Sequence, residues 1–129
     1  MYKPKLTKDI RCPLEYGLDL FGGKWKSRII CVLAHKKNLR YSEVRKEMHN
    51  VTDAALAATL KELQQAGIIR RQQFEEIPPR VEYQLTEKGC SIVPILQSIC
   101  KWSGIYYRSG SKQELTECQK CDYGQRKGD

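Results

Sequence analysis

The chain has 129 residues and a formal net charge of +8 at neutral pH, a length that fits one small domain. Its longest unbroken apolar run, residues 29–34, is far too short to span a membrane, and no apolar stretch follows the basic N-terminus as a secretory signal requires. We therefore expect a cytoplasmic protein with no membrane partner and mostly reduced thiols. Residues 1–40 hold ten lysines and arginines against three acidic residues. This clustering favours a polyanionic partner, the alternative being a well-hydrated surface.

Two helices are expected at the start of the chain. Pro13 lies where a first helical turn tolerates proline, and the apolar spacing from Leu14 to Phe21 predicts a helix that Gly22 and Gly23 end. A second helix is expected from about Lys24, with one apolar face formed by Trp25, Ile29, Val32 and Leu33. A polar connection, residues 36–40, follows it.

The next segment has the pattern of a helix-turn-helix. Ser42 is the expected N-cap of a third helix, and His49 and Asn50 break that helix. Thr52 is the expected N-cap of a fourth helix, which runs to Ala66 with its leucines on the buried side. Gly67 suits the left-handed end of a helix. Two short helices joined by a tight turn, the second strongly amphipathic, are typical of this motif.

A hairpin and a long helix are expected after Gly67. Residues 81–85 alternate between apolar and polar side chains, which predicts a half-buried strand, and residues 68–74 are its expected antiparallel partner, joined by a loop at 75–79. Such a hairpin directly after a helix-turn-helix is a wing. Thr86 is expected to cap a final helix that is apolar on more than one side, so a second chain is its natural cover. Pro94 is expected to kink this helix.

The sequence thus predicts a mainly α fold with a small β-hairpin wing, a winged helix-turn-helix whose last helix is covered by a second chain. Three segments are expected along the chain. Residues 1–11 form a basic N-terminal arm, residues 12–108 form the DNA-binding and dimerisation domain, and residues 109–129 form a polar tail.

The order of elements and several motifs resemble the HxlR-type family of winged-helix regulators, relatives of the MarR-like regulators. The motifs are Cys12-Pro13-Leu14-Glu15, Leu18-Asp19-Leu20-Phe21-Gly22-Gly23-Lys24-Trp25, Arg40-Tyr41-Ser42-Glu43-Val44, Leu60-Lys61-Glu62-Leu63, Gly67-Ile68-Ile69 and Pro78-Pro79-Arg80-Val81-Glu82-Tyr83-Gln84-Leu85-Thr86. The resemblance covers roughly residues 11–105. It implies a homodimer, formed through the first and last helices, that binds double-stranded DNA at specific sequences and represses or activates nearby genes.

The fourth helix is the expected recognition helix. A step of about 100° per residue places its outward side chains opposite Leu56, where they would face the major groove. The helix start is a common place for phosphate contacts. The candidate DNA-binding residues here are Thr52, Asp53, Ala54, Ala55, Ala58, Lys61 and Gln65. Alanine methyl groups can pack on thymine but cannot hydrogen-bond base edges, so DNA shape is expected to contribute to specificity.

Further DNA contacts are expected outside the recognition helix. Arg80 and Arg70 lie on the wing, where Arg80 contacts either DNA or a carboxylate of its own chain. Glu75 and Glu76 lie beside the wing tip and oppose phosphate. The basic residues expected to attract phosphate elsewhere are Lys24, Lys26, Arg28 and Arg40.

Cys12 is the candidate for redox sensing. A thiol at a helix start, with Arg11 and Lys8 nearby in sequence, is favoured as the reactive thiolate. The resemblance implies the same, because the matching cysteine of several HxlR-type proteins senses electrophiles or oxidants. The alternative is a helix-start residue without a redox role. Cys31, Cys90 and Cys100 are expected to be small core residues.

Cys118 and Cys121 form a lone C-x2-C pair in the polar tail. Such a pair is half of a tetrahedral zinc site, which two tails of a dimer could complete. The alternative, an unstructured tail with idle thiols, leaves the protein without cofactor or metal, and we favour it.

No motif of a known catalytic class is present, so we expect a non-enzymatic protein. The preferred function is a dimeric DNA-binding regulator controlled by thiol modification or an unknown small effector. The alternative is a winged-helix module used mainly for protein contact, with little intrinsic DNA specificity. A thiol-based redox enzyme is a third, minor possibility.

Overall fold

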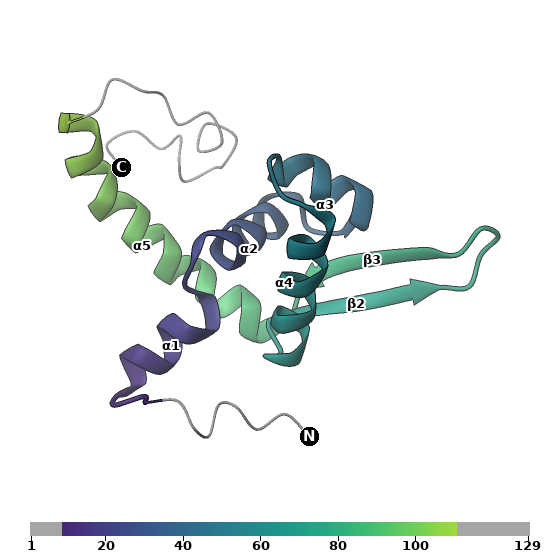
Figure 1. The fold of residues 1–129 in the computed structure, drawn as a ribbon, viewed down its shortest axis with the longest axis horizontal. Helices are drawn as coiled ribbons and strands as arrows, with labels where there is room; N and C mark the ends of the chain where they lie inside the picture. Colours follow the sequence, from purple (N-terminus) through teal and green to yellow (C-terminus); the bar gives the residue numbers. More distant parts are fainter. Residues whose placement is uncertain (1–8, 111–129) are drawn as a thin grey trace.

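The computed structural model describes the backbone of residues 9–110 (Figure 1). It describes the side chains of residues 9–107. The elements, in chain order, are α1 (Pro13–Phe21), α2 (Lys24–Lys36), β1 (Leu39–Arg40), α3 (Tyr41–Met48), α4 (Asp53–Gln65), β2 (Ile69–Phe74), β3 (Arg80–Leu85) and α5 (Glu87–Gly110). This order confirms the predicted winged helix-turn-helix, with α3 and α4 as the helical pair and β2 and β3 as the wing. Within the described part of the chain, no helix is long and apolar enough to cross a membrane.

Two glycines set the helix ends that the sequence predicts. Gly23 has φ +90° directly before α2, and Gly67 has φ +76° after α4, a region that side chains with a Cβ rarely adopt. Beyond α4, the amide of Gly67 donates to the carbonyl of Gln64 at 3.0 Å, and that of Ile68 donates to Leu63 at 2.9 Å. These bonds satisfy carbonyls at the end of the helix and turn the chain into β2.

Side-chain caps start α4 and α5 as expected. The Thr52 hydroxyl accepts a hydrogen bond from the amide of Ala55 at 3.1 Å, and the Thr86 hydroxyl accepts one from Gly89 at 3.1 Å. The expectation for Ser42 is wrong, because α3 begins at Tyr41 with Arg40 as its N-cap. The chain enters α3 directly from an extended strand, and the Glu43 carboxylate accepts the Arg40 amide at 2.8 Å.

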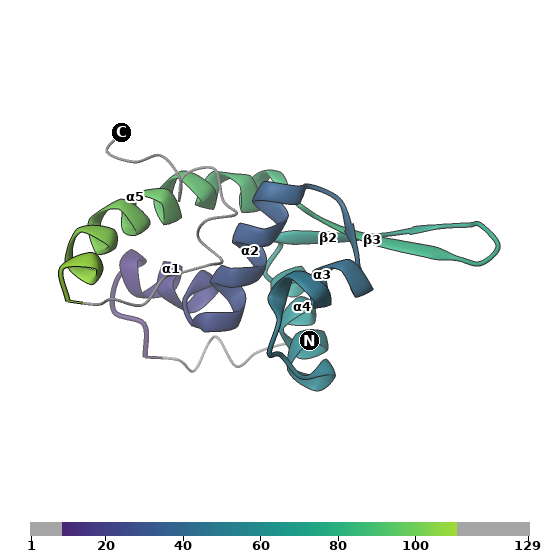
Figure 2. The same ribbon diagram turned by 90° about the horizontal axis from the view of Figure 1, so that it is seen from above.

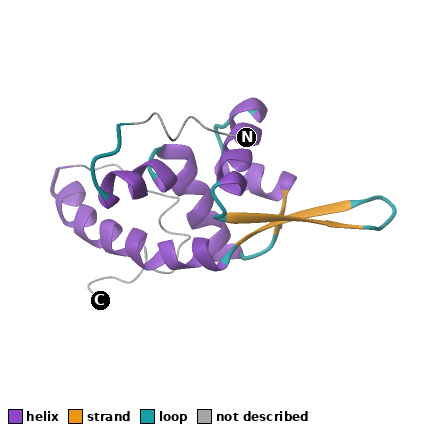
Figure 3. Cartoon of the chain, turned by 90° about the horizontal axis from the view of Figure 1, so that it is seen from below, coloured by secondary structure: helices purple, strands orange, loops and turns teal. Residues whose placement is uncertain are grey.

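The sheet has three strands in the order β1-β3-β2, all antiparallel. Strand β1 was not predicted, since residues 36–40 look like a polar connection. It pairs Leu39 with Tyr83 and Arg40 with Glu82, which joins the start of the helix-turn-helix to the wing. Strand β2 pairs with β3 over six residue pairs, from Ile69 with Leu85 to Phe74 with Arg80. The wing extends away from the helices (Figure 3).

The core lies among α2, α3 and α4 and against the base of the wing. Helix α2 packs on α3, α4, α5 and β3. The largest fully buried side chains are Ile29, Ile30, Leu33, Val44, Met48, Leu56, Leu60, Leu63 and Ile68. This packing fixes α4 by one face only, so its opposite face is left to solvent.

Helices α1 and α5 are poorly covered by the rest of the chain. No residue of α1 is buried, and α5 reaches the core mainly through Ile92. Their exposed large apolar side chains are Leu14, Tyr16, Leu18, Ile95, Ile99, Trp102, Ile105, Tyr106 and Tyr107. Helix α5 continues through Pro94 as one element, and Figure 2 shows it as an arc instead of two broken segments.

Candidate nucleic-acid interface

The outward face of α4 is formed by small and polar side chains. Ala54, Ala58, Lys61 and Gln65 are exposed, while Leu56 on the opposite side is buried. This is the distribution that the helical period predicts. Ala55 differs, because its side chain is half-buried against the core, so it does not belong to the outward face. A flat, nearly neutral surface remains, with one ammonium and one amide group at its C-terminal end.

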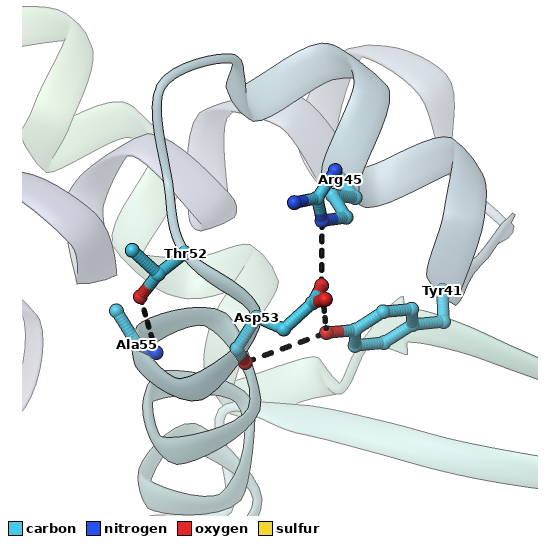
Figure 4. Close-up of polar contacts among 5 residues, drawn as sticks. All are labelled: Tyr41, Arg45, Thr52, Asp53 and Ala55. Carbon is cyan, nitrogen blue, oxygen red and sulfur yellow. Dashed lines mark hydrogen bonds and ion pairs between the residues drawn. The ribbon is translucent and has the colours of Figure 1, made fainter.

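The Asp53 carboxylate at the start of α4 is engaged by two side chains of α3. Arg45 Nε donates to Asp53 Oδ1 at 2.6 Å, and the Tyr41 hydroxyl donates to the same oxygen at 3.2 Å (Figure 4). Partial burial and this hydrogen bond raise the pKa of Tyr41 above its ordinary value of 10.0. The sequence predicted Asp53 as a residue at a phosphate-binding helix start, but its charge lies against an arginine of α3.

The three basic residues at the start of α2 have different roles. Lys24 is exposed, with its ammonium 4.5 Å from the centre of the Trp25 ring. Lys26 has only 23% of its side chain exposed, donates to the Asp19 carbonyl at 2.9 Å and lies 3.8 Å from the Glu62 carboxylate. Arg28 donates to the Met48 carbonyl at 3.5 Å. Lys26 and Arg28 therefore tie α2 to its neighbours, and Lys24 is the better placed of the three to attract phosphate.

On the wing, Arg80 contacts carboxylates of its own chain, one of the two alternatives that the sequence left open. Its guanidinium lies 2.9 Å from Glu76 and 3.6 Å from Glu82, and 4.1 Å from the centre of the Phe74 ring. Arg70 on β2 and Arg40 on β1 are both exposed. The wing therefore offers Arg70 and its neighbour Arg71, which is also exposed, as accessible cations, while the charge of Arg80 is balanced by two carboxylates.

A further group of residues lies where α3 ends and α4 begins, and only Thr52 among them was predicted from the sequence. A shallow hollow there is lined by Arg45, Lys46, His49, Asn50, Val51 and Thr52. His49 turns the chain at φ 58°. The signal was present in the sequence, because Arg45 and Lys46 lie off the apolar stripe of α3 and must face outward. Lys46 places positive charge beside the first turn of the recognition helix, and so does the Arg45 guanidinium, whose charge Asp53 partly balances.

Cys12 is exposed and is the N-cap residue of α1. Its carbonyl accepts the amides of Glu15 at 3.0 Å and Tyr16 at 3.2 Å. Arg11, expected to favour the thiolate, forms an ion pair with Glu15 at 3.2 Å, so part of its charge is balanced, and Lys8 lies outside the described residues. Among the other cysteines, Cys31 and Cys100 are half-buried, but Cys90 is exposed on the first turns of α5 and is not a core residue.

A metal site finds no support in residues 9–110, where no group of three or more His, Cys, Asp or Glu side chains could hold an ion. The tail pair, Cys118 and Cys121, lies outside the described residues.

Residues 20–111 match the family model described as an HxlR-like helix-turn-helix. The chain belongs to this family. An uncharacterized HTH-type transcriptional regulator of Methanothermobacter thermautotrophicus is 46% identical over 103 residues, 80% of this chain and 76% of the relative. YdzF of Bacillus subtilis, also named an HTH-type transcriptional regulator, is 42% identical over 97 residues, 75% of this chain and 89% of YdzF.

Solved structures agree with this assignment. The reduced form of the transcriptional regulator YodB from B. subtilis has a TM-score of 0.71 at 33% identity, covering 79% of this chain and 100% of YodB. The redox regulator HypR in its oxidized form has a TM-score of 0.68 at 33% identity, covering 81% of this chain and 100% of HypR. The protein is therefore an HxlR-type transcriptional regulator with a winged-helix fold, and the family implies DNA binding.

Proposed function

We propose that this HxlR-type protein acts as a homodimer that binds specific double-stranded DNA through the outward face of α4. The observation that carries the proposal is the arrangement of α4 itself. Its leucine face is locked into the core, and the opposite face is open and ends in Lys61 and Gln65. A helix held in this way can enter the major groove without rearrangement of the domain.

The proposed base contacts are few. Lys61 can donate to guanine and Gln65 can bond adenine in the major groove, while the methyl groups of Ala54 and Ala58 suit thymine. Thr52 and the backbone at the start of α4 suit a phosphate. Lys24, Arg40 and Arg70 are exposed cations that suit further phosphates. With so few direct contacts, sequence-dependent DNA shape supplies part of the specificity.

The proposed dimer interface is the apolar surface of α1 and α5. Exposed apolar surface concentrated on two elements marks an interaction site. On this surface Trp102, a residue that is 65% exposed, and Tyr106 form a tilted ring pair with 5.4 Å between the ring centroids. A second copy of the chain covers this surface in the proposal. A two-fold dimer of this kind presents two recognition helices to half-sites about 34–36 Å apart.

Control of DNA binding through Cys12 is part of the proposal. An exposed thiol at the start of α1 lies on a helix of the proposed interface, so its modification would change the relative position of the two recognition helices. The likeness to the redox regulator HypR, and to the regulator YodB in its reduced and diamide-treated forms, supports this role. The alternative input is a small effector bound by the dimer. In either case the protein works where DNA and reduced thiols are found, in the cytoplasm.

A protein-interaction module remains the second candidate, because the alanine-rich face of α4 also suits contact with another protein. Footprinting on DNA that flanks the protein's own gene, with and without oxidant, separates the two. The proposed regulator protects an inverted repeat and releases it on oxidation. A Cys12→Ser variant keeps the footprint in oxidant, and release that persists in this variant removes Cys12 from the mechanism. No protection at low salt favours the protein-interaction module.

A further inference from the structure

We infer that Arg45 of α3 binds a backbone phosphate of the DNA, and that Asp53 and Tyr41 hold its guanidinium in position for that contact. The inference rests on the proposed docking of α4 in the major groove. It assigns a contact to the helix before the recognition helix, at the hollow where α3 ends and α4 begins.

Tyr41, Arg45 and Asp53 form a cluster between α3 and α4. Figure 4 shows Arg45 and Tyr41 reaching from α3 toward Asp53, the first residue of α4. Asp53 uses one oxygen for Arg45 Nε at 2.6 Å and for the Tyr41 hydroxyl at 3.2 Å. The contact with Arg45 engages one edge of the guanidinium, and 48% of the Arg45 side chain is exposed. The N–H groups on the two terminal nitrogens of Arg45 are left for a partner other than the described residues, such as DNA.

The contact between Asp53 and Arg45 contributes little to the stability of the fold. Asp53 and Arg45 are both exposed, and an exposed ion pair contributes little to stability because water screens it. A carboxylate beside DNA also repels phosphate. The macrodipole favours an acidic residue in the first turn of α4, but it does not require the contact with Arg45, which therefore suggests a further purpose. Fixing the direction of a long, flexible arginine is such a purpose, because the side chain then loses less conformational entropy when it binds.

A phosphate suits the edge of the Arg45 guanidinium that Asp53 does not contact. A guanidinium can bond a carboxylate on one edge and a phosphate on another, whereas a lysine ammonium acts as a point charge. A tyrosine hydroxyl is protonated at physiological pH, so that of Tyr41 is a donor to Asp53. Arg45 also lines the hollow with Lys46, His49 and Thr52, beside the positive end of the α4 dipole. These basic and polar surroundings suit a phosphate of the DNA backbone.

The test is whether Asp53→Ala tightens or weakens DNA binding. If Asp53 acts only through its charge, Asp53→Ala removes a repulsion and tightens DNA binding. If Asp53 positions Arg45, the same substitution weakens binding, by about threefold or more. The control is Glu75→Ala, which removes an exposed acid of the wing and should leave affinity unchanged or slightly higher. Binding is measured on a duplex selected from random sequence by the wild-type protein.

The arginine itself has a distinct signature. Arg45→Ala should weaken binding about tenfold, as the loss of a charge-assisted hydrogen bond does. It should also lower the slope of log affinity against log salt by about one for each bound protomer. In the Arg45→Ala background, Asp53→Ala should no longer weaken binding. Asp53→Asn, which keeps an acceptor oxygen, should bind more tightly than Asp53→Ala.

Thermal unfolding of each variant shows that the domain is folded. Tighter binding by Asp53→Ala, or an unchanged salt slope for Arg45→Ala, overturns the inference while leaving the proposed function intact. A wild-type protein that selects no duplex even at low salt overturns the proposed function instead.

Discussion

Lys26, Arg28 and Arg80 use their charges inside the molecule. Each lies within contact distance of a carbonyl or a carboxylate of another element or of the wing. The formal charge of the chain therefore overstates the charge that is available to DNA. Lys24 and Arg45 are the better candidates for phosphate contact, since their side chains are more exposed.

Lys24 and Lys26 form a matched pair for testing this difference. Lys24→Gln should lower the salt slope of DNA binding by about one for each protomer and leave the free energy of unfolding unchanged. Lys26→Gln should do the reverse, costing about 1 kcal/mol of stability through its lost hydrogen bond. Urea unfolding and salt titration measure the two quantities. Equal salt slopes for both variants would refute the assignment.

The sequence could predict which residues of α4 face outward, because the leucine spacing defines the buried side. It could not predict the partners of charged residues. Asp53 and Arg45 are eight positions apart, and only the turn at His49 brings their helices together. Likewise, the pairing of Arg80 with Glu76 depends on how the loop folds back onto the strand.

At the scale of elements, the hydroxyl cap of Thr52 fixes where the recognition helix begins. Thr52→Ala should cost about 1 kcal/mol of unfolding free energy, the usual loss for an N-cap, and should weaken DNA binding because the first turn of α4 frays. Thr52→Ser keeps the hydroxyl acceptor and should behave like the wild type. Urea unfolding measures both, and equal stability of the alanine and serine variants would contradict this role.

The wing offers another comparison between two arginines. Arg70 is exposed on β2, whereas Arg80 has 28% of its side chain exposed between two carboxylates. Arg70→Gln should lower the salt slope by about one for each protomer. Arg80→Gln should leave that slope unchanged, since its charge is already balanced. A salt titration that gives the larger change for Arg80 would show that the ion pairs open on DNA.

Long elements were predictable and short ones were not. Helices with three or more apolar residues at regular spacing, and the alternating strand β3, have a period that the sequence displays. Strand β1 has only two residues, too few for any alternation. Its pairing with β3 also moves the N-cap of α3 from the expected Ser42 to Arg40, because the extended chain leads straight into the helix.

At the scale of the whole molecule, the apolar surface of α1 and α5 lies apart from the wing (Figure 1). This separation lets the proposed dimer form without covering α4. Trp102→Ala should weaken the dimer about tenfold or more, as expected for a central aromatic residue of an interface. Ile77→Ala is the control, because Ile77 is fully exposed at the wing tip and its loss should leave the dimer unchanged. Sedimentation velocity across a dilution series measures both, and equal dissociation constants would contradict the proposed interface.

The central claim is that the outward face of α4 enters the major groove of duplex DNA. Dimethyl sulfate reacts with guanine N7 in that groove, so protection of N7 in a selected duplex tests the claim most directly. We predict two protected clusters about one helical turn apart, centre to centre, and their loss when Lys61 and Gln65 are both replaced by glutamate. Full reactivity of every guanine N7 in a saturated protein–DNA complex would contradict the account.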